Sequence, residues 1–214
     1  LKASLGRLPE APAAGSMSWR VTKQIAGDGF VIKCVLFESR PGVWVSSNLY
    51  QPAEPQASMP GFVISHSHHT SKTHGELQDM GMTWARMGCL VLVPDHMGHG
   101  ERRQHPFSTE RDYPTSFRVS RQDYYFRYDL ALQAHLAGES YVGQLVWDLS
   151  RGVDLLLAQP GIDSKCIALL GAVAGGGDPA AVAAALDRRI QVAVPFNFGG
   201  DRKSTRLNSS HIPL

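Results

Sequence analysis

The sequence predicts an α/β fold, in which a mostly parallel sheet is covered by helices on both faces. Short, continuously apolar runs indicate strands that are buried on both sides. Stretches with the apolar spacing of amphipathic helices separate these runs. Buried strands that alternate with such helices form parallel βαβ units with right-handed crossovers. With 214 residues, 43% of them hydrophobic, the chain is long enough to bury one sizeable core.

The first half of the chain predicts a hairpin followed by a strand and a helix. Residues 30–37 and 43–50 are rich in β-branched and aromatic residues, and the turn ESRPG joins them as a hairpin. After a proline-rich loop, the apolar run GFVIS at 61–65 predicts a buried strand. Residues 75–87 carry an apolar stripe typical of a helix, and Gly88 is expected to end it.

The middle of the chain predicts a second buried strand, CLVLVPD, and then a long excursion. Residues 106–136 are charged and aromatic without a clear period, so we expect an irregular segment that partly covers a site. From Tyr141 onward the apolar spacing predicts a long amphipathic helix, which Pro160 and Gly161 end.

The last part of the chain predicts two further buried strands, CIALLG and IQVAVPF, with a helix between them. Asp178 is expected to cap that helix and Pro179 to be its first residue. The carboxyl ends of parallel strands meet at one edge of a sheet, where ligands bind near a switch in strand order. We therefore expect any chemistry in the segments HSHHTSKTH, DHMGHGER, GAVAGGGD and NFGG.

Composition excludes several classes of partner. No apolar run reaches the roughly 20 residues of a membrane-spanning helix. The three cysteines lie in apolar, strand-like runs, which favours buried thiols over a disulfide framework. Residues 201–211, DRKSTRLNSSH, resemble the translation of a sequencing-library adapter, so we expect 201–214 to be a read-through artefact; a polar natural tail is the alternative. Without this tail the formal charge falls from +2 to zero, which removes the argument for nucleic acid.

Four stretches resemble motifs of a known family, and they have the same order and spacing as in that family. They are PGFVISHSHH, LQDMGMTWARMGCLVLVPDHMGHGER, VWDLSRGVDLLLAQPGIDSKCIALLG and GGGDPAAVAAALDRRI. Over residues 30–200 they resemble the α/β-hydrolase superfamily, particularly its acetyl-xylan-esterase-like and prolyl-oligopeptidase-like branch. The resemblance implies an α/β-hydrolase-type sheet and the hydrolysis of carboxylic esters. Residues 1–29 then form a poorly defined N-terminal extension, and residues 30–200 a partial hydrolase domain.

The corner GAVAGGG lacks the residue that the resemblance implies. In the superfamily a serine nucleophile stands on a tight strand-to-helix turn between small residues. Aligning the glycine run puts Ala174 at the tip, whereas reading GAVAG as the pattern puts Val173 there, and both registers stay open. Neither side chain can attack a carbonyl. The resemblance also implies backbone oxyanion donors at Ser67, His68 and Gly175.

The other members of a catalytic triad have no obvious provider. In the superfamily the acid and the histidine follow the nucleophile along the chain, but only one strand is predicted after this corner. We therefore expect the sheet to lack its last strands, which leaves an apolar edge open to self-association. Asp187 lies too close to the corner to be the acid, and LDRRI predicts a helix-end turn instead.

Histidines and carboxylates follow two predicted strands. They are His66, His68, His69 and His74 after the first, and Asp95, His96, His99, Glu101 and His105 after the second. Imidazole and carboxylate together suit zinc, but this spacing matches no ligand motif. We therefore expect no metal and no cofactor. If a metal does bind, the candidate ligands are His66, His68, His69, His96 and His99.

Three hypotheses about function follow. The first is an esterase-family protein with a degenerate corner and no serine-hydrolase activity. The second is a binding protein that uses the same cleft for a carbohydrate or ester-like ligand. The third is a metal-dependent hydrolase that uses the histidine loops. The chain begins with Leu1, so its compartment stays open, although the resemblance is compatible with secretion or the periplasm.

Overall fold

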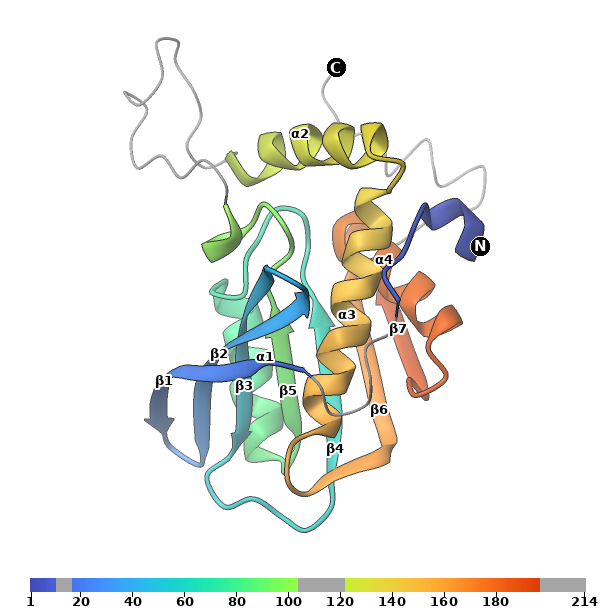
Figure 1. The fold of residues 1–214 in the computed structure, drawn as a ribbon. Helices are drawn as coiled ribbons and strands as arrows, with labels where there is room; N and C mark the ends of the chain where they lie inside the picture. The colour runs from blue at the N-terminus through green and yellow to red at the C-terminus, as the bar shows by residue number, and fades with distance from the viewer. Residues whose placement is uncertain (11–16, 104–121, 197–214) are drawn as a thin grey trace, which may run out of the picture.

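The computed structural model describes residues 1–10, 17–103 and 122–196, which form one seven-stranded sheet between two layers of helices (Figure 1). The strand order is β1-β2-β3-β5-β4-β6-β7. The strands are β1 Trp19–Gly27, β2 Phe30–Arg40, β3 Val43–Pro52, β4 Met59–Ser65, β5 Leu90–Pro94, β6 Ile162–Ala172 and β7 Val192–Phe196. β1, β2, β3 and β5 pair antiparallel in succession, whereas β5, β4, β6 and β7 are parallel neighbours. The predicted α/β class, with its parallel sheet, is confirmed.

Helices cover both faces of the sheet, as predicted. The helices are α1 Gly75–Arg86, α2 Gln122–Leu136, α3 Tyr141–Leu157 and α4 Val173–Leu186, and two short 3₁₀ turns are Lys2–Leu5 and Gly100–Arg102. One apolar cluster lies under α1 and another under α3 and α4. Leu90 and Leu92 of β5 join the second cluster, while Val91 and Val93 join the first. Successive side chains of a strand point to opposite faces, which is why β5 is apolar at every position.

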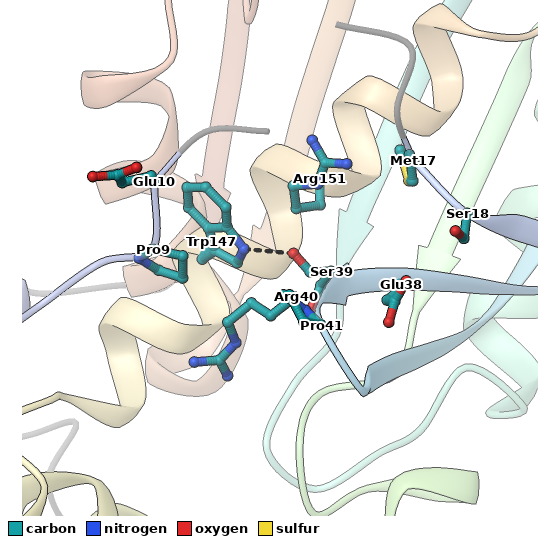
Figure 2. Close-up of a pocket in the computed structure, with 10 residues that line it drawn as sticks. All are labelled: Pro9, Glu10, Met17, Ser18, Glu38, Ser39, Arg40, Pro41, Trp147 and Arg151. Atoms are coloured by element: carbon teal, nitrogen blue, oxygen red, sulfur yellow. Dashed lines mark hydrogen bonds between the residues drawn. The ribbon is translucent and has the colours of Figure 1, made fainter. Parts of the chain in front are cut away.

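The hairpin and the long helix lie where the sequence places them, and they touch each other. β2 and β3 pair antiparallel from Phe30↔Pro52 to Arg40↔Val43. At the turn end of this hairpin, the indole Nε1 of Trp147 on α3 donates a hydrogen bond to the Ser39 carbonyl oxygen at 2.8 Å (Figure 2). This contact packs the antiparallel part of the sheet against α3.

Three elements differ from the sequence prediction. β1 extends the sheet by pairing with β2, although the segment before residue 30 carries no clear strand pattern. α2 forms a regular helix inside the stretch that was predicted to be irregular. α4 begins at Val173, so Asp178 and Pro179 lie inside the helix and Asp178 is not its N-cap. His105, the excursion at 106–121 and the tail at 201–214 lie outside the described residues.

The three cysteines differ in burial, and the last strand is exposed. Cys89 is buried and Cys34 is partly buried, but Cys166 is exposed, which corrects the expectation of three buried thiols.

β7 is an edge strand, and its apolar side chains Val194 and Phe196 are exposed. Within the described part of the chain, no helix combines the length and apolarity that crossing a membrane requires.

Candidate functional site

The strand order brings three connections to one edge of the sheet. β4 is central, and the chain leaves it towards β5 on one side and later returns to β6 on the other. This reversal is a topological switch point, where ligands bind in α/β sheets. The segments that begin at the carboxyl ends of β4, β5 and β6 are the loop 66–74, the loop 95–102 and the first turn of α4.

The corner between β6 and α4 contains a strained residue. β6 ends at Ala172 and α4 begins at Val173, with no connecting loop. Val173 has a φ of 50°. It is the only non-glycine residue with a positive φ among the residues that the structure describes. A β-branched side chain in this region is an outlier. Val173 is partly buried, whereas Ala174 is exposed.

The first turn of α4 packs directly against the loop that follows β4. A Cβ atom added at Gly175 would collide with the backbone of His68, and one added at Gly176 would collide with the carbonyl oxygens of Ser65 and His66. The glycine run is therefore explained by a close backbone approach. The N-terminus of α4, and with it the positive end of the helix dipole, lies at this contact, and no side chain caps its first turn.

The structure brings together three of the predicted histidines in a buried cluster. His66, His96 and His99 are each at most 3% exposed, and the rings of His66 and His96 stack at 3.8 Å. The His96 backbone N–H donates to His66 Nε2 at 2.9 Å, and His66 Nδ1 lies 2.8 Å from the Ser67 carbonyl oxygen. One nitrogen accepts and the other must donate, so His66 is the neutral Nδ1–H tautomer.

Burial favours the neutral form of His96. Burial lowers the pKa of His96 well below its usual range, and the positive charge of Arg102 lowers it further. His99 Nε2 lies 3.1 Å from the His68 carbonyl oxygen, which ties the two loops together. His69 lies nearby but is exposed.

Within residues 1–10, 17–103 and 122–196, no group of three or more histidine, cysteine or acidic side chains is arranged so that it could hold a metal ion. Two of the candidate ligands make hydrogen bonds to serine hydroxyls. The ring of His96 approaches the Ser65 hydroxyl through Nε2 at 3.0 Å, and the His69 backbone N–H donates to the Ser67 hydroxyl at 3.3 Å. His74, the remaining histidine after β4, is the exposed N-cap residue of α1.

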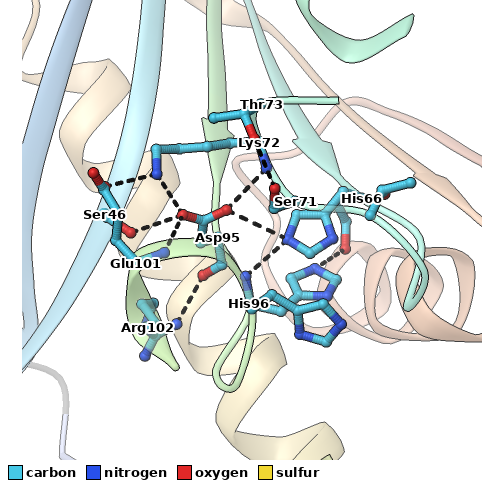
Figure 3. A network of polar contacts seen from close by, with 12 residues as sticks. Ser46, His66, Ser71, Lys72, Thr73, Asp95, His96, Glu101 and Arg102 are labelled. Carbon is cyan, nitrogen blue, oxygen red and sulfur yellow. Dashed lines mark hydrogen bonds and ion pairs between the residues drawn. The ribbon is translucent and has the colours of Figure 1, made fainter. Parts of the chain in front are cut away.

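A buried ion pair that the sequence analysis missed holds the two loops (Figure 3). Lys72 Nζ lies 2.5 Å from Asp95 Oδ2 and 2.8 Å from Glu101 Oε2. Asp95 also accepts hydrogen bonds from the Ser46 hydroxyl and from the Lys72 backbone N–H. The Asp95 carbonyl oxygen accepts from Arg102, so every oxygen of this residue is engaged.

The acidic neighbours of Lys72 stabilise its ammonium charge. Burial alone would lower the pKa of Lys72, but attraction to Asp95 and hydrogen bonds to Asp95 and Glu101 outweigh burial and raise it. Arg102 extends the network to Asp148 of α3 at 2.8 Å. A loop lysine is usually exposed, so no sequence pattern indicated that Lys72 would be 4% exposed.

The sequence matches one family model along most of its length. The model describes acetyl xylan esterase (AXE1), and it matches residues 30–201. The chain belongs to this acetyl xylan esterase family. A search of curated proteins found no match.

Several solved structures with the same fold are named as esterases. An acetyl xylan esterase from Paenibacillus sp. R4 has a TM-score of 0.62 and 20% identity, over 92% of this chain and 58% of that one. Acetyl xylan esterase 1 from Thermoanaerobacterium sp. JW/SL YS485 has a TM-score of 0.59 and 14% identity, over 84% and 51%. A glucuronoyl esterase from Solibacter usitatus has a TM-score of 0.58 and 16% identity, over 96% and 60%. This chain thus spans little more than half of their length.

Proposed function

We propose that this chain binds an acylated carbohydrate in the cleft of an esterase-family fold and does not hydrolyse the ester. The observation that carries the proposal is Val173, which has positive φ at the strand-to-helix corner where the superfamily places its nucleophile. An isopropyl side chain has no lone pair with which to attack a carbonyl carbon. The strand-to-helix corner is then kept without its reagent.

The backbone conformation favours Val173 over Ala174 as the nucleophile position. The nucleophile of this superfamily sits on a sharp, strained turn, and φ 50° at Val173 fits that description. Reading GAVAG as the motif also puts small residues on both sides of Val173. In this register the backbone N–H of Ala174, the residue after the tip, is one candidate oxyanion donor. The loop at Ser67 and His68 supplies the candidate donors on the other side.

The backbone N–H groups near the corner can bind the carbonyl oxygen of an intact ester. The uncapped first turn of α4 presents backbone N–H groups and the positive end of a helix dipole. Gly175 lets this turn approach the backbone of His68, which brings the first turn of α4 beside the loop after β4. The names of the related structures, acetyl xylan and glucuronoyl esterases, support a sugar ester as the ligand.

Binding and hydrolysis are measured separately to test the proposal. The full chain is titrated with an acetylated xylo-oligosaccharide by calorimetry, and acetate release is followed in the same sample. An active-site-directed phosphonate then tests for a reactive nucleophile by intact mass. We expect saturable binding, no acetate release and no covalent adduct. Absence of saturable binding would contradict the ligand-binding part of the proposal, and an adduct would contradict the loss of the nucleophile.

Two serine variants test the corner itself. We expect Val173→Ser and Ala174→Ser to show no turnover of small activated acyl esters above the parent rate, because a hydroxyl is a weak nucleophile until a base accepts its proton. The buried rings of His66, His96 and His99 are engaged in contacts within the two loops. Stoichiometric phosphonate labelling with burst kinetics in either variant would refute this expectation and locate a base near that position.

A further inference from the structure

One buried carboxylate joins the two loops of the candidate site (Figure 3). Asp95, the first residue after β5, is 1% exposed. Its Oδ2 accepts hydrogen bonds from the Ser46 hydroxyl of β3 at 2.8 Å and from Lys72 Nζ at 2.5 Å. Its Oδ1 accepts a hydrogen bond from the Lys72 backbone N–H at 2.9 Å. Asp95 therefore fixes the loop at 66–74 to two strands of the sheet.

Lys72 is held by both its side chain and its main chain. Its ammonium group contacts Glu101 Oε2 at 2.8 Å as well as Asp95, and its backbone N–H donates to the same Asp95 carboxylate. A side-chain contact alone would leave the backbone free to shift, because the four-carbon stem of lysine is flexible. The additional backbone hydrogen bond fixes the direction of the main chain at Lys72.

The segment between Lys72 and the candidate donors is short and turned. The Thr70 backbone N–H donates to the Ser67 carbonyl oxygen at 3.2 Å, and the His74 backbone N–H donates to the Ser71 carbonyl oxygen at 3.0 Å. These consecutive turns restrict the dihedral angles between Ser67 and Lys72. A shift of the main chain at Lys72 is therefore passed on to the backbone at Ser67.

The candidate donors lie against α4 with little space to move. A Cβ atom added at Gly175 would collide with the His68 backbone, and the His68 carbonyl oxygen lies 3.1 Å from His99 Nε2. Backbone atoms form the contact with Gly175, and they cannot rotate away as a side chain can. A small displacement of the loop therefore changes the distance between the candidate donors and the first turn of α4.

The surroundings of Asp95 leave no room for a substitute for the lysine ammonium. The Asp95 side chain is fully buried, and a Cβ atom added at Gly100 would collide with its carboxylate. Gly100 has a φ of 54°, which lets the turn at 98–102 wrap closely around this group. A buried ion pair is often no more stable than an apolar contact of the same volume, so stability alone does not account for it. What hydrogen-bonded charges can supply is one defined arrangement of the two loops.

We propose that Lys72 is a positioning residue, which sets the place of the backbone donors at Ser67 and His68 relative to the first turn of α4. It acts through the loop at 66–74 and does not touch the ligand, and Asp95 is its anchor on the sheet. This inference rests on the proposed function, because that function assigns these donors to ligand binding. The position of the donors is measured without a ligand, which separates the two proposals.

Stability and donor position are measured separately on the same variants. The variants are Lys72→Met and the double variant Lys72→Met with Asp95→Asn, each compared with the parent chain. Lys72→Met should lower the urea midpoint, because it leaves Asp95 charged and buried without its cation. The double variant removes both charges, so its midpoint should return most of the way to that of the parent.

Two NMR measurements on the ligand-free protein report the position of the loop. The first is the nuclear Overhauser contact between the backbone protons of His68 and Gly175, which should be strong in the parent because these backbones pack together. The second is hydrogen exchange of the Thr70 amide, which bonds to Ser67. In the double variant we expect a weaker contact and exchange about fivefold faster, the effect of one lost hydrogen bond. The affinity for the acetylated xylo-oligosaccharide should also fall about fivefold.

Arg189→Met is the matched control. It removes a cation that pairs with Asp154 and Asp187 at the carboxyl end of α4, so it should lower the urea midpoint and leave the contact between His68 and Gly175 unchanged. The proposal is overturned if the double variant keeps the contact and exchange rate of the parent, or if its affinity recovers together with its stability. A parent that binds no oligosaccharide would contradict the proposed function alone, and the two NMR measurements would still decide the role of Lys72.

Discussion

Replacing Val173 by glycine should reveal the strain at the corner. Holding a non-glycine residue at positive φ costs about 1–3 kcal/mol, and glycine adopts φ 50° without that cost. Against this gain, the variant loses the burial of a partly exposed valine, about 1 kcal/mol. We therefore expect Val173→Gly to range from neutral to about 2 kcal/mol more stable than the parent.

Val182→Gly is the matched control, since it makes the same chemical change on the same helix. Val182 is also partly buried, but it packs against the main apolar cluster with ordinary helical backbone. Its loss should cost about 1–2 kcal/mol through lost burial and the poor helix propensity of glycine. The two variants should therefore differ by at least about 1 kcal/mol.

Urea unfolding, followed by circular dichroism, measures both free energies on the same parent chain. In a thermal scan a difference of about 2 kcal/mol corresponds to about 4–8 °C for a domain of this size. If Val173→Gly destabilises as much as Val182→Gly, then Val173 is not strained, and the choice of Val173 over Ala174 as the nucleophile position loses its support.

Four further predictions follow from charges, edges and the tail. Lowering the pH from about 6.5 to 5 should destabilise the protein, because burial and the charge of Arg102 keep the pKa of His96 below its unfolded value, so the unfolded state takes up the proton first; a flat urea midpoint over this range would contradict it. Lys72→Met should cost about 3–5 kcal/mol by leaving Asp95 buried without its cation, and adding Asp95→Asn should recover part of the loss; a cost under about 1 kcal/mol would argue against the pair. Val194→Lys on the edge strand should shift association towards monomer in sedimentation velocity; a parent that is monomeric at every concentration would refute this. Deleting residues 201–214, which present no apolar face, should leave the melting temperature unchanged; a loss of several degrees would show that they are structural.

Elements whose apolar side chains are buried in a regular pattern could be predicted from the sequence. Elements held mainly by backbone pairing could not. β5 and α3 carry apolar patterns that match their burial, so their positions were predicted closely. β1 is exposed along its whole length and is held by backbone pairing with β2, which leaves little trace in the pattern of side chains. Strand pairing of this kind is visible only in three dimensions.

The start of α4 was mispredicted because a tertiary contact overrides local propensity. Three glycines and an Asp-Pro pair are unfavourable inside a helix, so the sequence favoured a start at Pro179. In the structure, Gly175 and Gly176 are required by the close approach of the loop after β4. The same contact lies at the corner where we propose the site, and local rules are expected to fail at functional sites.

The polar part of the site was predicted in position but not in burial. His66, His96 and His99 were expected at the carboxyl ends of two neighbouring strands, and they lie there. Their stacking inside the protein depends on the lengths of two loops, which no local pattern encodes. Lys72 was missed for a related reason, since its burial depends on Asp95 arriving from another strand.

The central place of β4 in the sheet has a consequence for how the chain folds during synthesis. Val63 pairs with Leu92 on one side and with Leu169 on the other. At roughly 5–20 residues per second, β6 emerges from the ribosome on the order of ten seconds after β4. During this interval β4 holds one apolar edge without its final partner. Non-local pairing of this kind slows folding and exposes strands to aggregation, so yield should depend more on chaperones that shield β4 than on the stability of the finished sheet.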